Sequence, residues 1–149
     1  MKKILVSICA LFLLTGCGDK VALTSTEFNN KMTEKGYNVV NVKEQFEYDY
    51  ITDALVAVSS DKKYQIEFYV LSTDDYAASF YGNNKTIFEN SKTSNNTETS
   101  VNLGNHSKYT LTTNGKFKVV SRIKNTVIYL NVDEVYKNEV KDVLKSLGY

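Results

Sequence analysis

The segment 64–71 alternates apolar and polar side chains with a period of two residues, and this pattern constrains the fold more than any other feature. Four residues point to one side (Tyr64, Ile66, Phe68 and Val70) and three to the other (Gln65, Glu67 and Tyr69). Such alternation is typical of an antiparallel strand with one buried face, because doubly buried parallel strands read as continuous apolar runs. Together with 54–59, across the polar turn 60–63, it predicts a β-hairpin in a sheet with one face in water.

Two helices are predicted between Thr24 and position 88. The first begins at Thr24, where Glu27 can complete a capping box, and it stops at Gly36. Between this helix and the hairpin, 37–42 reads as a further strand. The second helix is capped within 72–75, and its apolar residues recur at helical spacing to the end of the helix near position 88.

A third helix is predicted at the C-terminal end, capped by Asp133 and stopped by Gly148. Its apolar residues share one face (Tyr136, Val140, Val143, Leu144 and Leu147), and three lysines share another (Lys137, Lys141 and Lys145). This separation is typical of an amphipathic helix that packs against a sheet.

The stretch 109–132 predicts three strands. A two-residue loop at Asn114-Gly115 would place Leu111 opposite Lys118, whereas a three-residue loop, 113–115, would pair Leu111 with Phe117. We therefore predict the three-residue loop.

The segment 89–100 consists almost wholly of Ser, Thr, Asn, Lys and Glu, too polar to offset its ordering entropy, and predicts a mobile loop. The predicted fold class is α+β, an antiparallel sheet packed on one face by helices, in the order α-βββ-α-βββ-α.

The first 17 residues have the composition of an export signal. Two lysines, at positions 2 and 3, precede an apolar run of eleven residues, 4–14. As a helix this run would cross only about half of a hydrocarbon core about 30 Å thick. The following residues, Leu14-Thr15-Gly16-Cys17, match a lipobox, and the N-terminus therefore resembles bacterial lipoprotein precursors.

The resemblance to lipoprotein precursors implies a cleaved signal peptide, 1–16, and a diacylglyceryl group on Cys17. It also implies a short tether, 17–23, and an anchor on the extracytoplasmic face of the cell membrane. Two acyl chains give durable anchoring, whereas one chain binds only marginally. The remaining 24–149 is long enough for one domain with a real core. The lysine-rich, asparagine-rich composition suggests an AT-rich Gram-positive source.

Charge and cysteine content exclude several classes of function. Without the two leader lysines the chain has 16 basic and 17 acidic residues, a balance that argues against nucleic acid as a partner. Loss of Cys9 with the signal and acylation of Cys17 leave no disulfide and no cysteine metal site. We find no catalytic or cofactor-binding motif, and expect no cofactor.

His106 is the single histidine of the chain, so a catalytic triad or a histidine-containing metal site would have to use it. Its neighbours, at 104–107, are polar, and we interpret it as a solvated loop histidine. We interpret Arg122 and Lys118 as exposed charges on the polar face of a strand, with anion binding as the alternative.

One polar and aromatic segment is a candidate ligand or partner surface. It places three carboxylates among aromatic rings, with Glu44, Glu47, Tyr48, Asp49 and Tyr50 as its candidate residues. It is either a recognition edge, a calcium loop or a solvated bend, although it lacks the spacing of an EF-hand. Other tyrosines either pack at the edge of the core or line a groove (Tyr64, Tyr69, Tyr76, Tyr81 and Tyr109).

The sequence as a whole favours a non-enzymatic domain that binds an envelope protein, peptide or glycan, held at the bilayer through Cys17. The alternative is a cell-envelope hydrolase that uses carboxylates from Glu44, Glu47 or Glu67. A cleft that holds two carboxylates with raised pKa values would favour the hydrolase, and a flat aromatic patch would favour binding.

Overall fold

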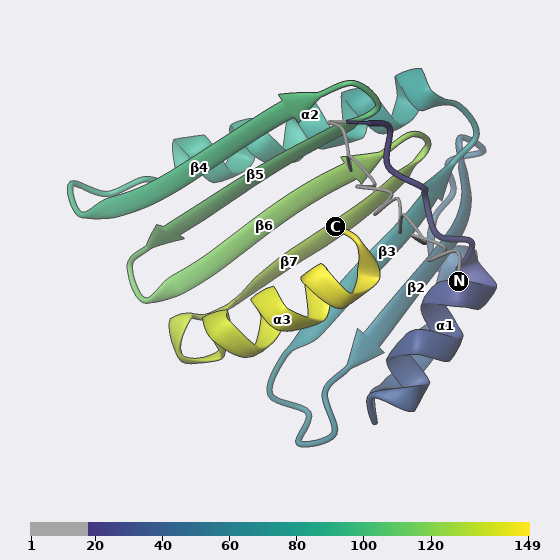
Figure 1. Ribbon diagram of the computed structural model, residues 1–149, viewed down its shortest axis with the longest axis horizontal. Coiled ribbons are helices and arrows are strands. Elements are labelled where there is room, and N and C mark those ends of the chain that lie inside the picture. Colours follow the sequence, from purple (N-terminus) through teal and green to yellow (C-terminus); the bar gives the residue numbers. More distant parts are fainter. Residues whose placement is uncertain (1–17) are drawn as a thin grey trace, which may run out of the picture.

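The computed structural model describes residues 18–149 and consists of one seven-stranded antiparallel sheet with three α-helices (Figure 1). The elements in chain order are α1 (Ser25–Glu34), β1 (Asn38–Asn41), the 3₁₀ turn η1 (Lys43–Gln45), β2 (Ile51–Val58), β3 (Gln65–Leu71), α2 (Asp74–Asn90), β4 (Asn96–Leu103), β5 (His106–Thr113), β6 (Lys116–Ile123), β7 (Thr126–Asp133), the 3₁₀ turn η2 (Glu134–Tyr136) and α3 (Lys137–Leu147). The predicted α+β class with an antiparallel sheet is confirmed.

The strands lie in the order β1-β2-β3-β7-β6-β5-β4, so two antiparallel meanders meet where β3 pairs with β7. Phe68 lies opposite Ile128 at this junction. The helix α2 connects β3 to β4, at the far edge of the sheet. The observed order is α-βββ-α-ββββ-α, one strand more than predicted.

The sheet is packed on both faces, so the prediction of a single covered face is wrong. In Figure 1, α1 and α3 lie in front of the sheet and α2 lies behind it. On the α3 side, the helices bury Phe28 and Leu144 against Phe68. On the α2 side, Ala77 and Phe88 join a second cluster that contains the sheet residues Tyr69, Leu111 and Val120. The alternation in β3 led to this error because Tyr69 was assigned to the polar face. A tyrosine ring can be buried as well as an aliphatic side chain can, while its hydroxyl keeps a hydrogen-bond partner.

The extra strand is β4, and its first five residues, 96–100, fall in the segment 89–100 that the sequence predicted to be a mobile loop. Its eight residues are all exposed, and each pairs with a residue of β5, from Asn96 opposite Thr113 to Leu103 opposite His106. The Oγ1 atoms of Thr99 and Thr110 form a cross-strand hydrogen bond of 2.7 Å. The sequence of a polar edge strand shows no periodic apolar residues, because backbone hydrogen bonds to the neighbouring strand, and not burial of side chains, hold the strand in place.

The loop between β5 and β6 has two residues, so the predicted three-residue loop is wrong. Asn114 and Gly115 both have positive φ, at 49° and 70°, and Leu111 lies opposite Lys118. Primed two-residue turns require this backbone conformation and match the twist of the strands. Leu111 does not pair with Phe117 as predicted, because both faces of these strands are buried. With apolar residues on both faces, a buried apolar residue need not lie opposite another one.

The predicted helix ends are confirmed at most positions. Thr24 and Glu27 form a capping box at the start of α1, and Gly36 and Gly148 have φ of +84° and +89° after α1 and α3. Asp133 is different: it makes no capping hydrogen bond, and its carboxylate instead accepts from Lys116 Nζ at 2.5 Å.

Candidate functional site

Three tyrosine rings form a continuous stack at the end of the sheet where β2 begins and α2 starts. The rings of Tyr48 and Tyr50 are 5.1 Å apart between centroids with planes at 19°, and those of Tyr50 and Tyr76 are 5.1 Å apart at 13°. The two outer residues of the stack, Tyr48 and Tyr76, are 58% and 50% exposed. We call these three residues the tyrosine stack.

Backbone hydrogen bonds fix both segments that carry the tyrosine stack. The amide of Ile51, the first residue of β2, donates to the Tyr48 carbonyl at 3.2 Å, and Ser72 donates to the Tyr50 carbonyl at 2.9 Å. Thr73 caps α2 by accepting from the Tyr76 amide at 3.1 Å. Tyr50 also packs against the cluster on the α2 side. The stack is therefore held before any ligand arrives.

Exposed carboxylates flank the tyrosine stack in the sequence (Glu44, Glu47, Asp49, Asp74 and Asp75). The ion pairs within residues 18–149 use other carboxylates (Asp61, Glu89, Glu98 and Asp133). The local charge is consequently negative. Asp74 and Asp75 also lie in the first turn of α2, where a negative charge stabilises the helix dipole.

The structure brings together the residues predicted as a ligand or partner surface and adds one that the sequence reading missed. Glu44, Glu47, Tyr48, Asp49 and Tyr50 all lie in the connection between β1 and β2. Tyr76 completes the stack from α2, 26 positions further along the chain. Asp74 and Asp75, which directly precede Tyr76, could have indicated it from the sequence, because the predicted surface also combines tyrosines with carboxylates.

Metal binding receives no geometric support in residues 18–149. Within that range, no three His, Cys, Asp or Glu side chains are grouped so that they could hold a metal ion.

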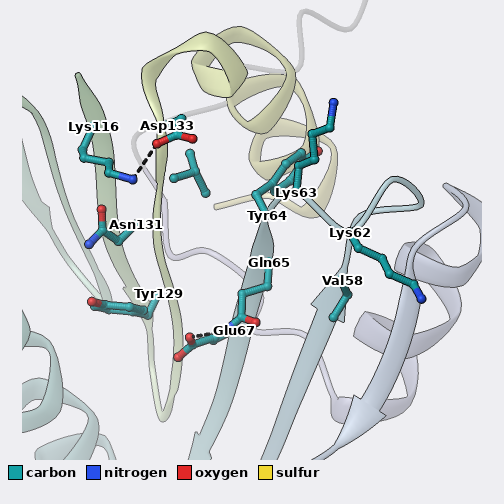
Figure 2. Close-up of a pocket in the computed structure, with 11 residues that line it drawn as sticks. Val58, Lys62, Lys63, Tyr64, Gln65, Glu67, Lys116, Tyr129, Asn131 and Asp133 are labelled. Atoms are coloured by element: carbon teal, nitrogen blue, oxygen red, sulfur yellow. Dashed lines mark hydrogen bonds and ion pairs between the residues drawn. The ribbon is translucent and has the colours of Figure 1, made fainter.

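A groove of about 430 Å³ opens on the α2 side, where β3 and β7 diverge (Figure 2). Their pairing covers only 67–70 of β3 and 126–129 of β7. Beyond it, Tyr64 and Gln65 line one wall, and Asn131 and Asp133 line the other.

The two carboxylates that line this groove, Glu67 and Asp133, already have hydrogen-bond or ion-pair partners. Glu67 accepts from the Tyr69 hydroxyl at 2.5 Å and from Gln65 Nε2 at 2.9 Å. Burial and the Glu67 carboxylate together raise the pKa of Tyr69 far above its usual value. Asp133 pairs with Lys116. Neither Glu44 nor Glu47 lines the groove, so the structure does not bring together the three carboxylates of the predicted hydrolase.

His106 is the first residue of β5 and is half-buried, so its interpretation as a solvated loop residue is wrong. Burial lowers the pKa of its imidazole, and the nearby charges of Lys20 and Arg122 lower it further.

Arg122 and Lys118 are also half-buried rather than exposed, on the α2 side of β6. The Arg122 guanidinium donates to the Lys124 carbonyl at 3.3 Å, and Lys118 Nζ donates to Ser91 Oγ at 2.6 Å.

The tyrosines that left two interpretations open fall into two groups. Tyr64, Tyr69 and Tyr109 are buried and Tyr81 is half-buried, as expected of packing at the core and its edge. Tyr76 belongs instead to the exposed stack.

The predicted lipidation site, Cys17, lies outside the described residues. Among residues 18–149, no helix has the length and apolar character needed to cross a membrane.

Comparisons with known proteins give little. No protein-family profile matches the chain, and no curated protein matches it. Among solved structures, a GTP-binding regulator from Thermotoga maritima is similar, with 17% sequence identity and a TM-score of 0.47. That likeness covers 85% of this chain and 89% of the other, and GTP binding is stated of that protein alone.

Proposed function

We propose that this chain is a membrane-anchored lipoprotein of the extracytoplasmic face, and that its domain binds an envelope protein or peptide without catalysis. The observation that carries the binding role is the tyrosine stack, with exposed aromatic rings beside carboxylates that have no lysine partner among residues 18–149.

The chemistry of this surface favours a cationic ligand. Aromatic faces attract ammonium and guanidinium groups through the ring quadrupole, and the five flanking carboxylates add an attraction of the same sign. Tyrosine rings lose little side-chain entropy on binding, and here Tyr50 already fixes the two outer rings. We infer that the ligand is a lysine-rich or arginine-rich segment.

A defined peptide tests the binding role. A fluorescein-labelled hexalysine peptide is titrated with the protein, with hexaglutamine, a neutral peptide of the same length, as the matched control. We expect saturable binding of hexalysine alone. Tyr48→Ala/Tyr76→Ala removes two cation–π contacts worth about 0.5 to 1 kcal/mol each at an exposed site, so it should weaken binding roughly tenfold.

Two further variants separate recognition from folding. Tyr48→Phe/Tyr76→Phe keeps all three rings and should keep the affinity, whereas Asp49→Asn/Asp74→Asn should weaken binding with the stack intact. Equal affinity of the wild type and the double alanine variant, both folded by circular dichroism, would exclude the stack as the recognition surface.

The anchor is tested separately at Cys17. Alanine provides no sulfur for the thioether, so Cys17→Ala should abolish incorporation of a labelled fatty acid and processing to the mature length. Equal labelling of the wild type and the variant in a bacterial host would contradict the lipoprotein assignment.

A further inference from the structure

Five lysines lie together on the α3 side of the molecule: Lys20, Lys108, Lys137, Lys141 and Lys145. Two neighbouring grooves connect them, since Lys108 and Lys141 line both the groove between α3 and the β4–β5 strands and the groove at the end of α3. Lys137, Lys141 and Lys145 follow one stripe of α3, as the sequence predicted. We call these five residues the lysine face.

The lysine face carries more positive than negative charge. Among residues 18–149, the lysines in ion pairs are four others (Lys63, Lys85, Lys92 and Lys116). Two members of the lysine face donate to main-chain oxygens: Lys20 Nζ to Gly148 O at 3.0 Å and Lys108 Nζ to Tyr149 O at 3.2 Å. Burial lowers the pKa of Lys108, and the charges of Lys20 and Lys141 lower it further. Asp142 is the single side-chain carboxylate that lines either groove.

Exposed apolar side chains lie beside these lysines. Leu103 and Val101 of β4 are 48% and 39% exposed, and Val101 lies directly opposite Lys108 in the β4–β5 pairing. Val21, one residue after Lys20, is 84% exposed. The surface therefore combines cationic groups with apolar residues that water does not favour.

The chain enters the domain at this same place. The backbone of Lys20 exchanges two hydrogen bonds with the Asn105 side chain in the β4–β5 turn, at 2.9 and 2.7 Å. A β-carbon added at Gly104 would lie 2.9 Å from the Asp19 carboxylate. In Figure 1 the purple segment before α1 runs to this turn. Cys17 is joined directly to Gly18, and consecutive Cα atoms are about 3.8 Å apart. Gly18, the first described residue, is two residues before Lys20, so the anchor proposed at Cys17 would join the domain beside the lysine face.

We propose that the lysine face, with Val21, Val101 and Leu103 at its rim, docks on the anionic headgroups of the bilayer and lays the domain against the membrane. This inference rests on the proposed anchor, which supplies the nearby bilayer. Lysines are attracted to anionic headgroups, while apolar side chains enter the interfacial layer. A soluble polyanion would account for the lysines but not for the exposed apolar residues.

Docking on the α3 side leaves the α2 side facing away from the bilayer. Tyr50 of the tyrosine stack packs on the α2 side, so the two surfaces serve different partners.

The test uses the protein purified from bacterial membranes, with its intact mass recorded first. It is placed in phosphatidylglycerol or phosphatidylcholine vesicles, and the reactivity of each lysine toward an amine label is read by mass spectrometry. Each lysine near anionic headgroups strengthens membrane binding about fivefold. Because a docked lysine is shielded from the label, we expect Lys141 and Lys145 to react at least fivefold more slowly in phosphatidylglycerol than in phosphatidylcholine vesicles. Lys62 and Lys63, at the β2–β3 turn, should be unchanged, and 0.5 M salt should remove the difference.

Matched variants identify the surface. Lys141→Gln/Lys145→Gln should abolish the slower labelling of Lys137 in phosphatidylglycerol vesicles, and Lys62→Gln/Lys63→Gln, with the same loss of charge, should preserve it. Circular dichroism checks that both pairs fold.

The other possible results either contradict the docking proposal or test the docking surface and the anchor independently of each other. Equal labelling in the two lipids overturns the docking surface. Slower labelling with soluble polyglycerol phosphate but not with vesicles replaces the bilayer by a polymer. An intact mass without the lipid overturns the anchor, yet slower labelling when that chain is added to phosphatidylglycerol vesicles still supports the docking surface.

Discussion

Truncation of Phe68 tests the two-sided architecture most directly. Phe68 is 0% exposed, stacks on Phe28 at 4.6 Å with planes at 9°, and meets the Tyr149 ring edge-on at 6.5 Å. Removal of a buried phenyl group costs about 3 to 5 kcal/mol, and lost aromatic pairing places this site in the upper half of that range. We expect Phe68→Ala to lower the free energy of unfolding by about 4 kcal/mol.

The second arm of the test is Val120, which is fully buried in the cluster on the α2 side. Val120→Ala removes two methyl groups and should cost about 2 kcal/mol. Because the sheet separates Phe68 from Val120, the two costs should add to within about 0.5 kcal/mol.

Urea unfolding followed by circular dichroism measures all four states of the cycle, in sulfate buffer so that the double variant remains folded. Val135→Ala, at an exposed position of η2, is the surface control and should change stability by less than about 0.5 kcal/mol. A coupling above about 1 kcal/mol would mean that Phe68 and Val120 share one core, and the two-sided sheet would be refuted. A loss below about 1 kcal/mol for Phe68→Ala would refute its central place.

Two further predictions concern carboxylates. Glu67→Ala should lower the free energy of unfolding in urea by about 1 to 2 kcal/mol, because the buried Tyr69 hydroxyl loses its hydrogen-bond acceptor. A loss under about 0.5 kcal/mol would instead support the solvent-exposed position that the sequence predicted for Glu67. Hydrogen bonds from Lys92 and then from Tyr109 hold the pKa of Glu98 below its usual 4.5, so its contribution to stability is complete above that pH and is lost as the pH falls through the lowered pKa. Lys92→Gln removes the larger cause, so the Glu98 pKa measured by NMR should rise toward 4.5, and an unchanged value would contradict the assigned pair.

Local sequence determined those features of this protein that depend on neighbouring residues. The capping box of Thr24 and Glu27 and the glycine stops at 36 and 148 need only the backbone of their own helix ends. The apolar face of α3 and the hairpin around 60–63 are likewise set by spacing over a few residues. The sequence also placed Tyr48 and Tyr50 among carboxylates on one polar connection.

The tertiary structure decided what depends on contacts between distant segments. β4 is a strand because β5 offers it a ladder, and its exposed side chains leave no apolar period to predict it. The second covered face exists because α2 crosses behind the sheet, and this crossing also brings Tyr76 onto the rings of Tyr48 and Tyr50. The lysine face likewise required α3, β5 and the segment at Lys20 to meet, and burial and charge accumulate only when such segments converge.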